Sequence, residues 1–126
     1  MKTGLIAFAT TLALSAPLAF ARPGDVHIQC RMADSVMSIQ IDLNAMTNSG
    51  PYAYQGFNPN HPSESGTAVL TNRSDEKVLH LELDKVDGSR LGTLTVDTAQ
   101  DPDQGHNATL NVGSPFLLGC AVSKEQ

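Results

Sequence analysis

Apolar and polar residues alternate along most of the chain after Arg22, in short runs separated by residues typical of turns. Such alternation points every second side chain toward a core and the others toward solvent, which is the pattern of half-buried β-strands. No window of eleven or more residues has the spacing of an amphipathic helix. We therefore predict eight strands, near residues 25–33, 36–43, 51–57, 66–72, 77–86, 89–97, 106–112 and 116–122.

A turn at Asp34-Ser35 fixes the register of the first two strands. As a two-residue turn it places Ile28 opposite Ile41, and a slip by one residue would place Ile28 opposite Gln40. Because such a slip moves every side chain to the other face of the sheet, the apolar face selects the register. The predicted apolar pairs are Met32 with Met37, Cys30 with Ile39, Ile28 with Ile41 and Val26 with Leu43.

Two further turns predict hairpins that share this apolar face. Asp87-Gly88 is a strong hairpin signal, because both central positions of the favoured turn need a positive φ. The predicted pairs across it are Leu81 with Leu94 and Leu79 with Val96. A three-residue loop over 113–115 predicts Val112 opposite Phe116, Leu110 opposite Leu118 and Ala108 opposite Cys120.

The two cysteines, Cys30 and Cys120, fall in the first and last predicted strands, both on the apolar face. In an exported chain an even pair of cysteines indicates a disulfide. A bridge between the first and last strands of a meander closes the sheet. We therefore predict an eight-stranded, mostly antiparallel up-and-down barrel, or a flattened sandwich version of it, closed by one disulfide. A Greek-key connection through the long segment 58–65 is the alternative topology.

Residues 1–21 have the layout of a secretory signal peptide. Lys2 precedes an uncharged apolar stretch, and Ala19-Phe20-Ala21 resembles a cleavage site directly before Arg22. The stretch is shorter than the roughly 20 residues of a membrane span. We expect cleavage to leave one domain, 22–126, that is periplasmic or secreted and has no membrane span.

The charge of the expected mature chain argues against two classes of partner. All 13 acidic residues follow position 21, and seven of the eight basic ones do, so residues 22–126 carry a net charge of −6. An acidic chain without a basic cluster is a poor partner for nucleic acid or an anionic membrane. It attracts basic partners instead. In a meander, one end of the barrel gathers an acidic rim, which consists of Asp75, Glu76, Asp97, Asp101 and Asp103.

Segment 101–105 has the spacing D-x-D-x-G, which is half of a calcium-binding loop. The glutamate that would complete such a loop is replaced by Val112. We interpret the segment as an acidic turn and predict no metal site and no cofactor.

Three of the four aromatic residues of the expected mature chain cluster before the longest loop, and the fourth is Phe116. Tyr52 and Tyr54 share one face of their strand, while Phe57 lies on the other and leads into loop 58–65, which contains His61 and Glu64. If the tyrosines are buried, Phe57 points outward, and if Phe57 is buried, the tyrosines form an exposed pair. Since aromatic anchors dominate binding surfaces, we predict partner binding at Tyr52, Tyr54, Phe57, His61 and Glu64, with the acidic rim second.

No sequence motif for an activated nucleophile or a phosphate loop is present, so we predict a monomeric, non-catalytic module that docks a protein or peptide. In expected architecture alone, it is similar to small bacterial lysozyme inhibitors, which are also exported β-barrels with a disulfide. The alternatives are a small-molecule carrier, which needs a roomy interior, and a metal-dependent hydrolase. The hydrolase would need ligands that converge from His61, Glu64, His80 and Glu82.

Overall fold

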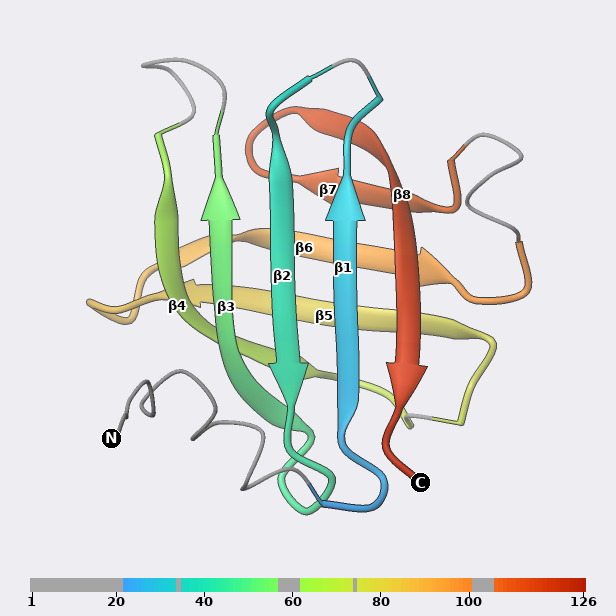
Figure 1. The fold of residues 1–126 in the computed structure, drawn as a ribbon. Coiled ribbons are helices and arrows are strands. Elements are labelled where there is room, and N and C mark those ends of the chain that lie inside the picture. Colours follow the sequence, from blue (N-terminus) through green and yellow to red (C-terminus); the bar gives the residue numbers. More distant parts are fainter. Residues whose placement is uncertain (1–21, 34, 57–61, 74, 101–105) are drawn as a thin grey trace, which may run out of the picture.

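The structure is a computed structural model that describes residues 22–33, 35–56, 62–73, 75–100 and 106–126. Within these ranges it contains eight strands and no helix. The strands are β1 Val26–Arg31, β2 Ser38–Leu43, β3 Ser49–Gln55, β4 Glu64–Leu70, β5 Val78–Lys85, β6 Arg90–Asp97, β7 Ala108–Asn111 and β8 Pro115–Lys124. Each strand pairs antiparallel with the next, and β8 pairs with β1, so the chain is a closed up-and-down barrel (Figure 1).

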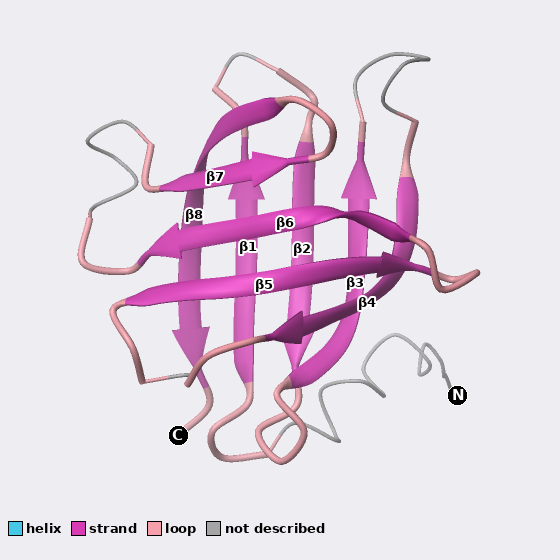
Figure 2. Ribbon diagram, turned by 180° about the vertical axis from the view of Figure 1, so that it is seen from behind, coloured by secondary structure: helices cyan, strands magenta, loops and turns pink. Residues whose placement is uncertain are grey.

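The barrel is flattened into two layers that cross steeply. β1, β2, β3 and most of β8 run side by side in one layer, and β5, β6 and β7 cross behind them (Figures 1 and 2). β4 and β8 bend from one layer to the other. Between the layers lies a core of buried side chains: Val26, Ile28, Cys30, Met37, Ile39, Ile41, Leu43, Tyr52, Tyr54, Ala68, Leu70, Leu79, Leu81, Leu83, Leu94, Val96, Ala108, Leu110, Leu118 and Cys120.

Two of the three predicted hairpin registers are confirmed. β1 pairs with β2 so that Ile28 lies opposite Ile41, and β5 pairs with β6 so that Leu81 lies opposite Leu94. The β5–β6 pairing becomes irregular after Leu83, close to the turn. In both hairpins the apolar residues of one strand meet those of its partner, which is the reason the register can be derived from the sequence.

The third register is wrong by two residues. The structure pairs Leu110 with Phe116, whereas the predicted loop places Leu118 opposite Leu110. The three-residue loop comprises 112–114 and so begins one residue earlier than predicted, with Gly113 at its centre in the left-handed region at a φ of 98°. A shift of two residues keeps the same side chains on the inner face. The alternation therefore cannot distinguish the two registers.

β3 and β4 both begin two residues earlier than predicted. The turn after β2 ends at Asn48, which has a φ of 55°, a conformation that asparagine tolerates better than most residues. β3 can therefore restart at Ser49. Its partner β4 then begins at Glu64, which the sequence analysis places in the loop and the structure pairs with Tyr54.

Gly66 allows β4 and β5 to approach closely. A Cβ atom on Gly66 would lie 1.9 Å from the backbone oxygen of Asp84. Gly50 and Gly92 are in the same situation on two other strands. At such positions any other residue would push the strands apart, so these glycines help the sheet to bend and close.

The predicted disulfide is present. Cys30 and Cys120 lie directly opposite each other in the β1–β8 pairing, with their Cα atoms 4.0 Å apart, and both are buried. The bridge therefore joins the first and last strands at the seam where the barrel closes.

Candidate functional site

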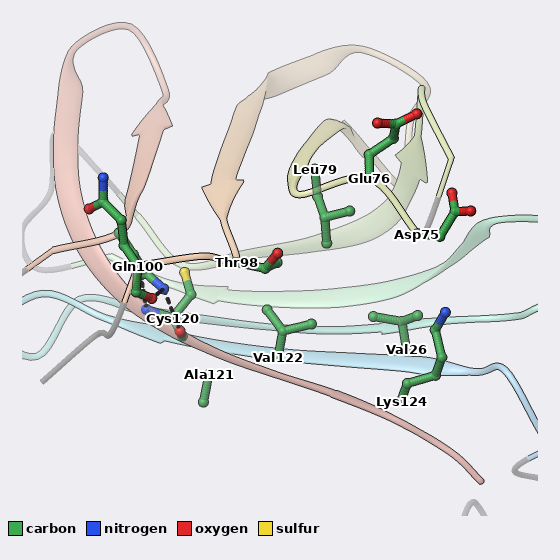
Figure 3. A pocket seen from close by; sticks show the side chains of 11 residues that line it. Val26, Asp75, Glu76, Leu79, Thr98, Gln100, Cys120, Ala121, Val122 and Lys124 are labelled. Carbon is green, nitrogen blue, oxygen red and sulfur yellow. Dashed lines mark hydrogen bonds between the residues drawn. The ribbon is translucent and has the colours of Figure 1, made fainter.

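In this up-and-down barrel the loops after β2, β4 and β6 belong to the same end as the start of β1 and the end of β8. In Figure 1 the loop after β2 lies below β1, and the loops after β4 and β6 lie to the side of β8. This is the end at which the sequence predicts an acidic rim. It holds a pocket of about 440 Å³, which we call the rim pocket. The residues that line it are Val26, Asp75, Glu76, Leu79, Thr98, Gln100, Asn107, Cys120, Ala121, Val122 and Lys124 (Figure 3).

The rim pocket combines an apolar floor with carboxylates. Val26 and Leu79 are buried core residues, and Val122 packs against the core. Asp75 and Glu76, from the loop after β4, lie across the pocket from Val26 and Val122 (Figure 3). Both carboxylate residues are exposed. An aliphatic chain could therefore lie on the floor while a cationic end group reaches the carboxylates.

The two carboxylates differ in their own partners. The Arg73 guanidinium bonds the Asp75 carboxylate and holds its pKa below the usual value, with a smaller contribution from Lys124. Glu76 forms no ion pair with any residue that the structure describes. Within the described part of the rim pocket, Glu76 is thus a carboxylate without an ion-pair partner.

Asn107 forms the back of the rim pocket and is buried. Its side-chain oxygen accepts a hydrogen bond from the backbone N–H of Cys120 at 2.7 Å, and its side-chain nitrogen donates to the Cys120 carbonyl at 2.9 Å. The backbone N–H and C=O of the buried residue Cys120 therefore both have hydrogen-bond partners, although β7 begins only at Ala108. The amide holds β8 in place beside the pocket.

His27 stabilises the same end of the barrel from the outside. Its Nδ1 lies 2.7 Å from Oδ1 of Asp42, the contact expected from the predicted register, and its Nε2 lies 2.9 Å from Oε2 of Glu125. The hydrogen bond to Asp42, followed by that to Glu125, raises the pKa of His27 above its usual value. The histidine links β1, β2 and the residue that follows β8.

The predicted acidic rim is only partly assembled in the part of the chain that the structure describes. Asp75 and Glu76 line the pocket. Asp97 is the last residue of β6, half-buried, and its carboxylate accepts a hydrogen bond from the backbone two residues later. It is not among the pocket residues. Asp101 and Asp103 lie outside the described residues, and so does the segment that resembles half of a calcium loop.

Of the two predicted arrangements of the aromatic cluster, the structure has the one with buried tyrosines. Tyr52 and Tyr54 are each 3% exposed. Phe57 and His61 lie outside the described residues, and Glu64 is half-buried at the start of β4. Partner binding at this end of the barrel remains a prediction, but the two tyrosines do not provide an exposed aromatic pair for it.

The two tyrosines have one unusual property. Neither hydroxyl has a hydrogen-bonding partner among the described residues, although both are buried. Burial raises the pKa of Tyr52 to about 12, with smaller contributions from Glu64 and Asp84. A cavity of about 170 Å³ at this end is lined by Tyr54, Pro62, Glu64, Lys85, Arg90, Leu91 and Val112.

Sequence reasoning missed several rim-pocket residues. Thr98 and Gln100 follow β6 in a segment whose only distinctive sequence feature is its acidic residues, and Lys124 lies beyond the predicted end of the last strand. The alternation of side chains along β8 could have identified Lys124, because the inward positions continue from Cys120 through Val122 to Lys124.

The described residues contain no group of three or more His, Cys, Asp or Glu side chains that could hold a metal ion. Within the same ranges the structure has no helix able to span a membrane. Comparisons with protein-family models, with curated proteins and with solved structures found no match to this chain.

Proposed function

We propose that this protein is an exported, non-catalytic binding module, and that its partner is a protein or peptide that presents a lysine or arginine side chain. The observation that carries the proposal is the rim pocket, in which an apolar floor lies across from the exposed carboxylate of Glu76. A long basic side chain matches both parts of such a site. The net charge of −5 for the whole chain would steer a basic partner toward it.

Export is part of the proposal. It is supported by the signal-peptide layout of residues 1–21 and by a disulfide, which persists mainly in oxidising compartments. Cleavage before Arg22 would release the domain 22–126.

The packed interior is the reason for preferring docking over carriage of a small molecule. Core residues on opposite layers, such as Ile41 and Leu94, are fully buried and belong to one cluster of apolar core side chains. A carrier would bind its ligand in the centre of such a barrel. The described pocket instead lies at one end, where loops can meet a larger partner.

The test uses residues 22–126 and a set of octapeptides with a central lysine, arginine, glutamine or glutamate. We expect binding of the lysine and arginine peptides that weakens as salt is raised, because salt screens exposed charges. The double variant Asp75→Asn/Glu76→Gln should lower the affinity at least tenfold. The matched control Glu64→Gln/Asp87→Asn removes the same charge at the opposite end of the barrel and should bind normally.

Two results would overturn the site. The first is equal binding of the basic and glutamine peptides. The second is that the Glu64→Gln/Asp87→Asn control loses binding while the Asp75→Asn/Glu76→Gln variant keeps it. That result would place the binding surface at the end that holds Tyr54 and Glu64.

A further inference from the structure

The backbone nitrogen of Arg22 lies beside a buried carboxylate. Residues 22–25 form a tight turn in which the Asp25 N–H donates to the Arg22 carbonyl at 3.0 Å. Pro23 and Gly24, with Gly24 at a φ of 91°, give the sequence pattern of a type II turn. This turn brings the Arg22 nitrogen to 2.9 Å from Oδ2 of Asp25.

The Asp25 carboxylate is held in place from its other side. Its Oδ1 accepts a hydrogen bond from the Ala45 N–H at 2.8 Å, and the residue is only 8% exposed. These two backbone hydrogen bonds, with that from Ala45 the larger, keep the pKa of Asp25 below its usual value. A charged, nearly buried carboxylate is thus oriented by the fold toward the nitrogen of one particular residue.

We propose that this carboxylate is the docking site for the α-ammonium group created when the chain is cut before Arg22. The inference rests on the export proposed above. Hydrolysis of the Ala21–Arg22 peptide bond by a processing peptidase consumes one water molecule, breaks the C–N bond, and leaves a carboxylate on Ala21 and an ammonium on Arg22. The neutral N–H that faces Asp25 then becomes a cation at the same place. Charge-assisted hydrogen bonds are about twice as strong as neutral ones.

The site connects the new terminus to the rim pocket. The Glu125 N–H donates to the Asp25 carbonyl at 2.8 Å, and the Gly24 N–H donates to the Glu125 carbonyl at 3.0 Å. Glu125 follows Lys124, which lines the pocket. Processing would therefore fix the end of β8 that forms one wall of the binding site.

Other charged groups near the ammonium must be considered in any test against pH. On β1, the charge of His27 favours ionised Asp25. The charge of the Arg22 side chain also lowers the pKa of Asp25. From β2 and the residue after β8, the carboxylates of Asp42 and Glu125 face His27.

The experiment compares two recombinant chains, one that starts at Arg22 and one that starts at Ala21, each with Asp25 and with Asp25→Asn. In the Ala21 chain the Arg22 nitrogen is an amide and carries no charge. The α-amino pKa is measured by the pH dependence of acylation with mass detection, and the unfolding midpoint in urea is measured from pH 6 to pH 10.

We expect the α-amino pKa of the Arg22 chain to lie at least about one unit above the ordinary 7.7–8.0, which corresponds to about fivefold slower acylation near pH 8. Because this pKa is raised on folding, the added stability is fully present below about pH 8 and is lost as the pH rises through the folded value. The Arg22 chain should thus unfold at higher urea than the Ala21 chain at pH 6, and the Asp25→Asn variants should not differ from each other.

An ordinary α-amino pKa in the Arg22 chain, or a raised one that persists in Asp25→Asn, would overturn the inference. The two proposals can fail separately. If the protein recovered from an exporting host starts at a residue other than Arg22, the processing proposal fails, whereas the ammonium site is still tested in the recombinant chains. Peptide binding by the rim pocket is measured independently of both.

Discussion

The side-chain amide of Asn107 lies opposite the backbone of Cys120 and forms both of the hydrogen bonds that a neighbouring strand would otherwise supply. β7 begins only at Ala108, which pairs with Leu118. One asparagine therefore extends the sheet by one position toward the disulfide and closes the back of the rim pocket.

Replacing Asn107 by alanine should destabilise the domain by about 2–4 kcal/mol, because it leaves two buried groups of Cys120 without partners and each costs about 1–3 kcal/mol. Urea unfolding of residues 22–126 measures this loss. Thr109→Ala is the matched control, since this exposed side chain belongs to the same region of β7, and it should change stability by less than about 0.5 kcal/mol. Equal effects of the two substitutions would contradict the role of the amide.

His27 should make stability depend on pH near neutrality. Its pKa is raised in the folded state by Asp42 and then by Glu125. A raised folded pKa means that the stabilisation is fully present below the unfolded value, about 6.5, and is lost as the pH rises through the folded value. The contribution is about 1 kcal/mol or less, as for other partly exposed ion pairs.

The measurement compares the free energies of unfolding of the native protein and His27→Gln. The difference should be largest near pH 5.5, where the histidine is charged, and small by pH 9. Asp42→Asn should reproduce most of the loss. A difference that stays constant from pH 5.5 to pH 9 would show that His27 acts through packing alone.

The parts of the fold that could be predicted are those in which a turn and an apolar face constrain each other. Around Asp34-Ser35, a slip by one residue would expose Ile28, so only one register is compatible with a core. The last hairpin lacks this constraint. Both registers, with Leu118 opposite Leu110 or opposite Ala108, bury the same residues, and the decision is made by the loop and by Asn107.

The candidate site was predicted less completely than the fold. Asp75 and Glu76 could be placed at one end because a meander puts alternate loops together. The pocket also needs the bend of β8, which sets Val122 and Lys124 across from those loops. The alternation of apolar residues predicts which side chains point inward, but it does not predict where a strand bends.

The disulfide should account for a large part of the stability. It closes a loop of 90 residues, for which the chain-entropy model gives about 4–5 kcal/mol. We expect Cys30→Ala/Cys120→Ala to lose about this amount in urea unfolding. Digestion without reduction should yield one peptide pair that joins the two cysteines. Two free thiols in the purified protein, or a double variant as stable as the native chain, would contradict the closure.

Tyr52 should make the barrel sensitive to alkali. Its hydroxyl is buried without a protein partner among the described residues, and burial raises its pKa to about 12 from an ordinary 10. Since the folded value is the higher one, the stability is fully present below about pH 10 and is lost as the pH rises toward about 12. Burial raises the pKa of Tyr54 as well, so both tyrosines should ionise only in strong alkali. Absorbance near 295 nm should therefore show a transition close to pH 12 that is reduced in Tyr52→Phe.

The same substitution tests the unpartnered hydroxyl at neutral pH. Leaving a buried polar group without a hydrogen bond costs about 1–3 kcal/mol, so Tyr52→Phe, which removes the hydroxyl and keeps the ring, should raise the free energy of unfolding by about 1 kcal/mol. Tyr54→Phe is the parallel variant. The Tyr54 hydroxyl is also buried without a partner among the described residues, but Tyr54 lines the 170 Å³ cavity at the barrel end. If Tyr52→Phe instead lowers stability by 1 kcal/mol or more, the hydroxyl is bonded in solution, and the interior at this end is polar and hydrated rather than dry.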